Sequence, residues 1–309
     1  MSDHETRRRV LQGTGTVALL ALAGCTGDEG GSGMDEEDGM NDGEGMDDGD
    51  SMDEANGTNE EGGMNEEGDG MDEEGDGMMG ETTTIAVRIE NVSATDVYPS
   101  DASTGGAVWI SPGAYAVHED ANPIHEPGEA ASIGLEALAE AGPPDGFDGE
   151  PGLVDELDGA MAVSHAGTYT PEDTVADPND PTGEAPGAPP IAPGGAFEFE
   201  VETEPGCRLS FASMFVPSND VYLSPADGIE LWPEGGDPAE GDVTDGIALF
   251  DAGTEPNAEP GFGPDQAPAQ DDPTQGDDEG GVVRRLADVD DGYDYPAVED
   301  VVRVTLAPQ

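Results

Sequence analysis

The stretch LSFASMFVPSNDVY, residues 209–222, carries the pattern that decides the fold class. Mostly apolar residues occupy alternate positions from Leu209 to Phe215, which is typical of a β-strand with one face against a core. Pro217 has no amide hydrogen to donate to a neighbouring strand, so it ends the strand. A Ser-Asn-Asp turn follows and closes at Asp220. The stretch therefore predicts a half-buried strand that leads into a turn carrying a carboxylate.

The same alternation recurs elsewhere in the chain. It predicts three further strands, at residues 82–89, 197–202 and 301–306. Two short helices are expected at residues 128–141 and 153–157, and the Pro- and Gly-rich residues 170–195 are expected to form a long loop. Because strands predominate, we predict that residues 82–309 fold as a mainly β domain, an antiparallel β-sandwich of two sheets with short helices.

A second motif, LFDAGTEPN at residues 249–257, predicts a metal site. Its apolar strand ends at Asp251, and the Ala-Gly-Thr turn brings Glu255 back beside that residue. Carboxylates at two strand ends can meet at one rim of a sandwich, where hard oxygen ligands suit Ca²⁺. We therefore expect Asp220, Asp251 and Glu255 to bind one calcium ion, with backbone or Asn carbonyls and water completing its coordination. The alternative is that all three are solvated surface groups, as most acidic residues are in a chain with 72 of them.

These two motifs also carry a resemblance to a known family. SFASMFVPSNDVYL (210–223) and LFDAGTEPNAEPG (249–261) resemble the spondin N-terminal domain of extracellular matrix proteins and microbial secreted proteins. The resemblance covers about residues 82–308. It implies a β-sandwich similar to a C2 domain that holds one calcium ion through acidic loop residues, here Asp220, Asp251 and Glu255. Animal members have Asp at the last of these positions. They also have further repeats and cysteines that this chain does not have, so their receptor binding is not implied.

The N-terminus resembles an export signal. Residues 7–9 are three arginines, a short apolar run follows, and Leu-Ala-Gly-Cys occupies residues 22–25. Paired arginines before such a run resemble a twin-arginine signal, and the last four residues resemble the lipobox of prokaryotic lipoproteins. We expect residues 1–24 to be removed and Cys25 to be lipidated, which anchors the chain at the extracellular face of the cell membrane. The alternative is a plain cleaved signal with an incidental cysteine.

Residues 25–81 form a low-complexity segment rich in Gly, Asp, Glu and Met. Repelling carboxylates and frequent glycine cannot bury a core, so we expect a disordered acidic tether. Methionine recurs at loose intervals of six or seven residues, and thioether sulfur suits Cu(I). A metal-scavenging lipoprotein that works through this Met-rich tract is therefore an alternative function.

The charge of the chain restricts its partners. Its 309 residues include 72 Asp and Glu against 8 basic residues, all of them arginine, for a formal net charge of -64. Nucleic acid is excluded as a partner, because phosphate binding needs Lys and Arg. A surface so acidic and without lysine fits a halophilic protein that works in very high salt, where its self-repulsion is screened. An unusually acidic protein of ordinary salt is the alternative.

These patterns predict an exported, lipid-anchored cell-surface protein whose calcium-binding domain serves adhesion or ligand binding rather than catalysis. A secreted hydrolase-like β-domain that uses carboxylates and His165 is an alternative from another class. His118 and His125 lie seven residues apart with no metal-binding spacing, and we expect them to be polar loop or rim residues. Cys207 has no base beside it in the sequence and is expected to be a small buried side chain.

Overall fold

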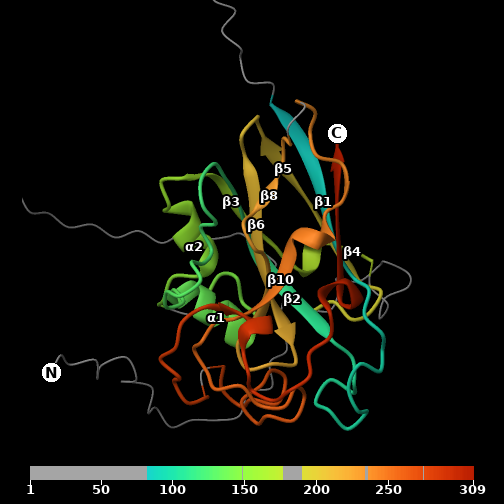
Figure 1. Cartoon of the computed structure of the whole chain (residues 1–309), viewed down its shortest axis with the longest axis vertical. Helices are drawn as coiled ribbons and strands as arrows, with labels where there is room; N and C mark the ends of the chain where they lie inside the picture. Colours follow the sequence, from blue (N-terminus) through green and yellow to red (C-terminus); the bar gives the residue numbers. More distant parts are fainter. Residues whose placement is uncertain (1–81, 148, 177–189, 234–235, 274) are drawn as a thin grey trace, which may run out of the picture. The chain divides into compact units, whose positions relative to one another are not determined.

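Two antiparallel β-sheets form the framework of the chain in a computed structural model (Figure 1). The structure describes residues 82–147, 149–176, 190–233, 236–273 and 275–309. The predicted signal, the predicted tether and Cys25 lie outside the described residues. The prediction of a mainly β, antiparallel two-sheet fold with short helices is confirmed.

The first sheet has five strands among the described residues, in the order β4-β5-β1-β12-β9. Their bounds are β4 (Thr174–Ala176), β5 (Ala196–Thr203), β1 (Thr83–Asn91), β12 (Val302–Pro308) and β9 (Gly241–Asp242). Alternate residues of the central strand β1 are buried opposite apolar partners on both neighbours. Val87 is paired with Phe199 of β5 and with Leu306 of β12. Cross-strand pairs of this kind give the sheet one apolar face for the core, as the alternation predicts.

The second sheet has seven strands in the described part of the chain, in the order β11-β10-β7-β6-β2-β3, with β8 beside β6. Their bounds are β11 (Arg284–Arg285), β10 (Ile247–Asp251), β7 (Val221–Pro225), β6 (Arg208–Val216), β2 (Trp109–His118), β3 (Val163–Tyr169) and β8 (Ile229–Glu230). One hydrophobic cluster joins the two sheets and includes Val87, Phe199, Phe211, Leu223 and Cys207. Cys207 is buried there as a free thiol, as predicted.

The strand β6 differs from its prediction. Its second face, with Ser210, Ala212 and Met214, is also fully buried, so the expectation of a half-buried strand is wrong. The cause is a layer formed by α1 (Ile133–Ala141) and α2 (Leu153–Asp158), which lies beside β6 and β3 (Figure 1). A second hydrophobic cluster fills this interface, with helix side chains packed against those of β6, β7 and β10.

The helix α1 begins later than the sequence suggests. The Ser132 side chain accepts a hydrogen bond from the Leu135 amide and caps the helix, so residues 128–132 of the predicted range lie outside it. Gly142 ends α1 in a left-handed conformation (φ 92°) that favours glycine. The second predicted helix is confirmed as α2.

The remaining elements are short. The predicted loop at 170–195 contains a 3₁₀ turn, η1 (Pro171–Asp173), and the strand β4, so its first part is wrong as a loop, and residues 177–189 of it lie outside the described residues. Three more 3₁₀ turns are η2 (Thr244–Gly246), η3 (Leu286–Asp288) and η4 (Val298–Asp300). Within the described ranges, every helix is too short or too polar to cross a bilayer.

Candidate metal centre

The two acidic motifs meet at the ends of neighbouring strands. Asp220 directly precedes β7, and Asp251 is the last residue of β10. The two strands pair in antiparallel register with Asp251 opposite Val221, and the Ala252 amide donates to the backbone carbonyl of Asp220 at 3.2 Å. Asp220 and Asp251 are therefore neighbours at one end of the second sheet, although they lie 31 positions apart in the chain.

Asp220 is fully buried and closes the turn that follows β10. Its Oδ2 accepts hydrogen bonds from the backbone amides of Thr254 (2.8 Å) and Glu255 (3.2 Å) and from the Thr254 hydroxyl (3.3 Å). Its Oδ1 is buried without a hydrogen-bond partner among the described residues. Burial, and then the Asp251 carboxylate, raise the pKa of Asp220 to about 7, while the hydrogen bonds from Thr254 and Glu255 oppose that shift.

The glycine of the turn has a definite role. Gly253 has φ +71°, in the left-handed region, and a Cβ built there would come within 2.6 Å of the backbone of Val282. Only glycine therefore fits both the turn and the neighbouring chain. The close approach accompanies a turn in which the amides of Thr254 and Glu255 donate to Asp220, whereas the sequence pattern predicts only that Glu255 returns beside Asp251.

Asp251 is fully buried and already bonded to a cation. The Arg284 guanidinium donates from Nε to Oδ1 (3.2 Å) and from Nη2 to Oδ2 (3.3 Å), and Asn257 Nδ2 donates to Oδ2 (2.6 Å). The pairing of β10 with β11 places Arg284 opposite Asp251. Burial raises the pKa of Asp251 above its ordinary value, while Arg284 and Asn257 oppose that shift. The side-chain carbonyl Oδ1 of Asn257 is buried without a partner among the described residues.

Glu255 is also buried, with 3% of its surface exposed. Asn219 Nδ2 donates to its Oε2 at 3.4 Å. The Glu255 carboxylate packs directly against the backbone of Gly276, where a Cβ would collide with it. All three residues lie at one end of the second sheet, where the backbone of Glu255 meets Asp220 and Asp251 follows the neighbouring strand, and they are buried there rather than solvated.

A fourth carboxylate belongs to the same rim. Glu140, near the end of α1, is only 4% exposed. Burial and then the Glu255 carboxylate raise its pKa to about 8, Asp220 adds to the rise, and a hydrogen bond with the Thr254 side chain opposes it. Sequence reasoning missed Glu140, because its pattern is that of an ordinary helix residue. Only the packing of α1 on the second sheet brings it to this rim.

The side-chain amides of Asn219 and Gln266 bond to each other and to the backbone of the loop that follows Glu255. The Asn219 Oδ1 accepts from the Ala258 amide and from Gln266 Nε2, both at 3.0 Å. Gln266 is fully buried, and its Oε1 accepts from the Gly261 amide at 2.8 Å. These bonds fix the chain that leaves Glu255, so the turn Ser-Asn-Asp supplies both a carboxylate and a loop anchor.

The oxygen atoms at this rim are of the type that binds a hard metal ion, but the described side chains do not form a ready coordination site. Among the described residues, no three or more His, Cys, Asp or Glu side chains are arranged to hold a metal ion. The unpartnered buried oxygens of Asp220 and Asn257 are nevertheless hard oxygen donors of the type that Ca²⁺ takes. The Asp251 carboxylate is bonded to Arg284, so a metal ion would share it or displace the guanidinium.

The histidines lie elsewhere and only partly as predicted. His165 is exposed on β3, with its Nε2 3.3 Å from the Tyr115 hydroxyl and its ring tilted against the Tyr115 ring. His118 is buried and hydrogen-bonded to Ser210, and His125 is buried against Phe250. His125 lies in a loop, as expected, and His118 is the last residue of β2, but both side chains are buried rather than placed at an exposed rim.

Comparison with known proteins adds no relative. No family model matches the chain, and no curated protein matches it. The resemblance of the two acidic motifs to the spondin N-terminal domain stays a prediction.

Proposed function

We propose that the chain is an exported, lipid-anchored protein of the cell surface whose spondin-like β-sandwich binds one calcium ion and serves adhesion or ligand binding. Asp220, Asp251 and Glu255 would hold the ion, with Asn257 as a further oxygen donor. The observation that carries this proposal is the burial of these carboxylates at one rim, with one oxygen of Asp220 left without a partner.

The physical argument concerns the cost of buried charge. An ionised carboxylate in a protein interior needs a cation or hydrogen bonds, or else it takes up a proton. Glu140, Asp220, Asp251 and Glu255 are all 4% exposed or less, and residues 82–309 contain five arginines and no lysine. Arg284 bonds to one of the four. A divalent cation would offset the charge of the others and let them stay ionised at neutral pH.

The ion would have a structural task. Asp220 and Asn219 hold the turn at 251–255 and the loop that follows it, both at one end of the second sheet. A metal bound between Asp220 and this turn would fix the loops at that end, which form the surface available to a ligand. The lipid anchor at Cys25 would attach this surface to the cell.

A calcium titration followed by thermal unfolding tests the proposal. The full chain is melted in a constant high concentration of KCl with EDTA, Ca²⁺ or Mg²⁺. A ligand that binds only the native state at about 100 times its Kd adds about 2.7 kcal/mol, so Tm should rise by roughly 5–10 °C with Ca²⁺. Asp220→Asn should abolish the rise. The control Glu200→Gln removes an exposed carboxylate of β5 and should keep it. An equal rise in both variants would contradict the proposed site.

A further inference from the structure

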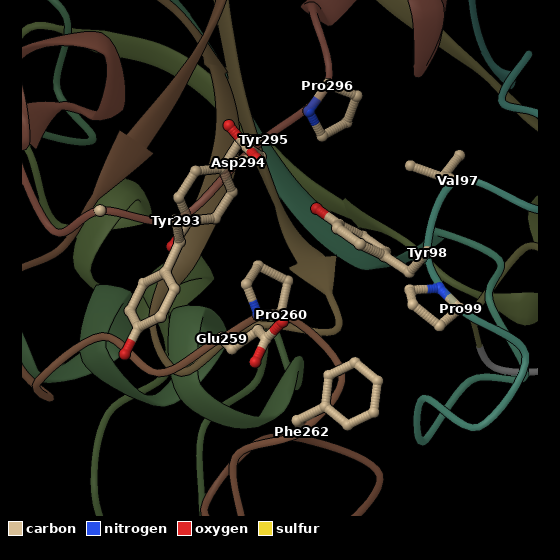
Figure 2. Close-up of a pocket in the computed structure, with 11 residues that line it drawn as sticks. Val97, Tyr98, Pro99, Glu259, Pro260, Phe262, Tyr293, Asp294, Tyr295 and Pro296 are labelled. Atoms are coloured by element: carbon tan, nitrogen blue, oxygen red, sulfur yellow. The ribbon is translucent and has the colours of Figure 1, made fainter.

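A cleft of about 450 Å³ opens between loops that are far apart in the sequence. Its lining includes four aromatic residues and two carboxylates, shown as sticks in Figure 2, namely Tyr98, Phe262, Tyr293, Tyr295, Glu259 and Asp294. Val97, Gly292 and the prolines Pro99, Pro260 and Pro296 complete an otherwise uncharged wall. Its volume lies in the range of small-molecule sites, roughly 300–1,000 Å³.

Aromatic surface is exposed at the mouth of this cleft. Phe262 and Tyr293 are 42% and 37% exposed and are two of the five large hydrophobic side chains that are exposed in the described part of the chain. Tyr98 extends from one wall toward the side that carries Asp294 and Tyr295 (Figure 2). Exposed apolar side chains gathered around a concave site are a feature of ligand-binding surfaces.

The charged groups that line the cleft are all carboxylates, which carry negative charge and accept hydrogen bonds. The carboxylates of Glu259 and Asp294 form no hydrogen bond or ion pair with the described residues, and no Lys, Arg or His lines the cleft. The Tyr295 hydroxyl already donates to Asp291 at 3.1 Å. The Tyr98 hydroxyl is buried without a partner among the described residues. A ligand here meets aromatic rings and unpaired carboxylates.

We propose that this cleft binds a small organic cation of the alkylated ammonium class. An ammonium group carrying methyl groups is attracted to the faces of Tyr and Phe rings and to a carboxylate, and its apolar surface suits the prolines. A sugar would also stack on aromatic rings, but it needs donors as well as acceptors, and this lining offers few donors. The proposal does not depend on calcium binding, because none of the candidate metal ligands lines the cleft.

Choline and its neutral isostere 3,3-dimethylbutan-1-ol test the proposal directly. Calorimetric titration of the full chain, in one high and constant KCl concentration, compares two probes of nearly the same shape that differ in charge. We expect saturable binding of choline and at least tenfold weaker binding of the isostere. Equal affinities would overturn the proposal in favour of a plain apolar pocket, and the absence of saturable choline binding would overturn it outright.

Variants locate the binding to this cleft. Tyr293→Leu and Phe262→Leu remove exposed rings, and each should weaken choline binding about three- to thirtyfold, the range expected for one cation–π contact. Asp294→Asn should weaken choline and leave the isostere unchanged. The control Glu200→Gln removes one negative charge from β5 and should change neither. If the three cleft variants keep the Tm and the choline affinity of the parent chain, the cation binds elsewhere and the proposal fails.

Discussion

The carboxylate of Asp220 accepts a hydrogen bond at 2.8 Å from the backbone amide of Thr254, a residue 34 positions further along the chain, and so joins the two acidic motifs. The same oxygen also accepts from the next amide, that of Glu255. One carboxylate oxygen thus satisfies the donors of the turn, while the other has no partner among the described residues. A structural role and a ligand role can therefore be separated at Asp220 by the choice of substitution.

Replacement of Asp220 should distinguish these roles. Asp220→Ala leaves the buried amides of Thr254 and Glu255 without an acceptor, and each unsatisfied group costs about 1–3 kcal/mol. Asp220→Asn keeps one oxygen for those amides, so in EDTA it should lose much less stability than the Ala variant. Denaturant unfolding in EDTA measures both, with Glu200→Ala as the exposed control. Equal losses for Asn and Ala would show that the hydrogen bonds to the turn contribute little.

Arg284 should affect stability and calcium binding in opposite directions. Arg284→Gln leaves the buried Asp251 without its cation and should destabilise the calcium-free protein by about 1–3 kcal/mol, since Arg284 is itself half-exposed. The same change frees the Asp251 carboxylate for a metal ion, so the Tm rise caused by Ca²⁺ should become larger. Arg303→Gln, which removes an exposed arginine of β12, is the matched control. A smaller calcium effect in Arg284→Gln would contradict the role of Asp251 as a ligand.

The calcium-free protein should lose stability as pH rises from about 5 to about 9. Burial raises the pKa of Glu140 to about 8 and that of Asp220 to about 7 in the folded state, so the native state binds more protons than the unfolded chain in this range. The free energy of unfolding therefore falls as these groups ionise. Glu140→Gln should flatten the upper part of this profile, and Glu200→Gln, which removes an exposed carboxylate of β5, should leave it nearly unchanged. Denaturant unfolding in EDTA at a series of pH values measures it, and a stability that rises with pH would be the opposite result.

Cys25 and Cys207 should behave differently in cell fractionation. Cys25→Ser removes the proposed lipid acceptor and should move the protein from the membrane fraction to the medium or the soluble fraction. Cys207 is a buried thiol of the β-domain, and Cys207→Ser should leave the protein in the membrane fraction. Retention of Cys25→Ser in the membrane fraction would show that another feature attaches the chain.

The parts of the fold that could be predicted are those that depend on a local pattern of apolar, polar and glycine residues. The alternation of Ile85, Val87 and Ile89 predicts a strand with one buried face, and the structure has that face against the core. The turn at Gly253 was likewise predictable, because an Asp-Ala-Gly-Thr sequence after an apolar strand has few conformations. Both features depend on residues that are close in the chain.

The parts that could not be predicted depend on packing between distant segments. The second face of β6 looks solvent-exposed in the sequence because Ser210 is polar, yet the α1 and α2 layer buries it. Glu140 reaches the acidic rim only through the same layer. Arg284 meets Asp251 because two-residue β11 pairs with β10, and a strand so short has no periodic signal. The cleft of Tyr98 and Tyr293 forms between three separate segments, at 97–99, 259–262 and 292–296, which no local pattern connects.

Equilibrium dialysis with radioactive calcium tests the central claim most directly, because it counts ions per chain. The full chain and its Asp220→Asn and Glu200→Gln variants are dialysed in high KCl against a range of Ca²⁺ concentrations. We predict one saturable ion per chain for the parent and for Glu200→Gln, and none for Asp220→Asn. No saturable ion in the parent, or one ion retained by Asp220→Asn, would contradict a calcium site at the Asp220 rim.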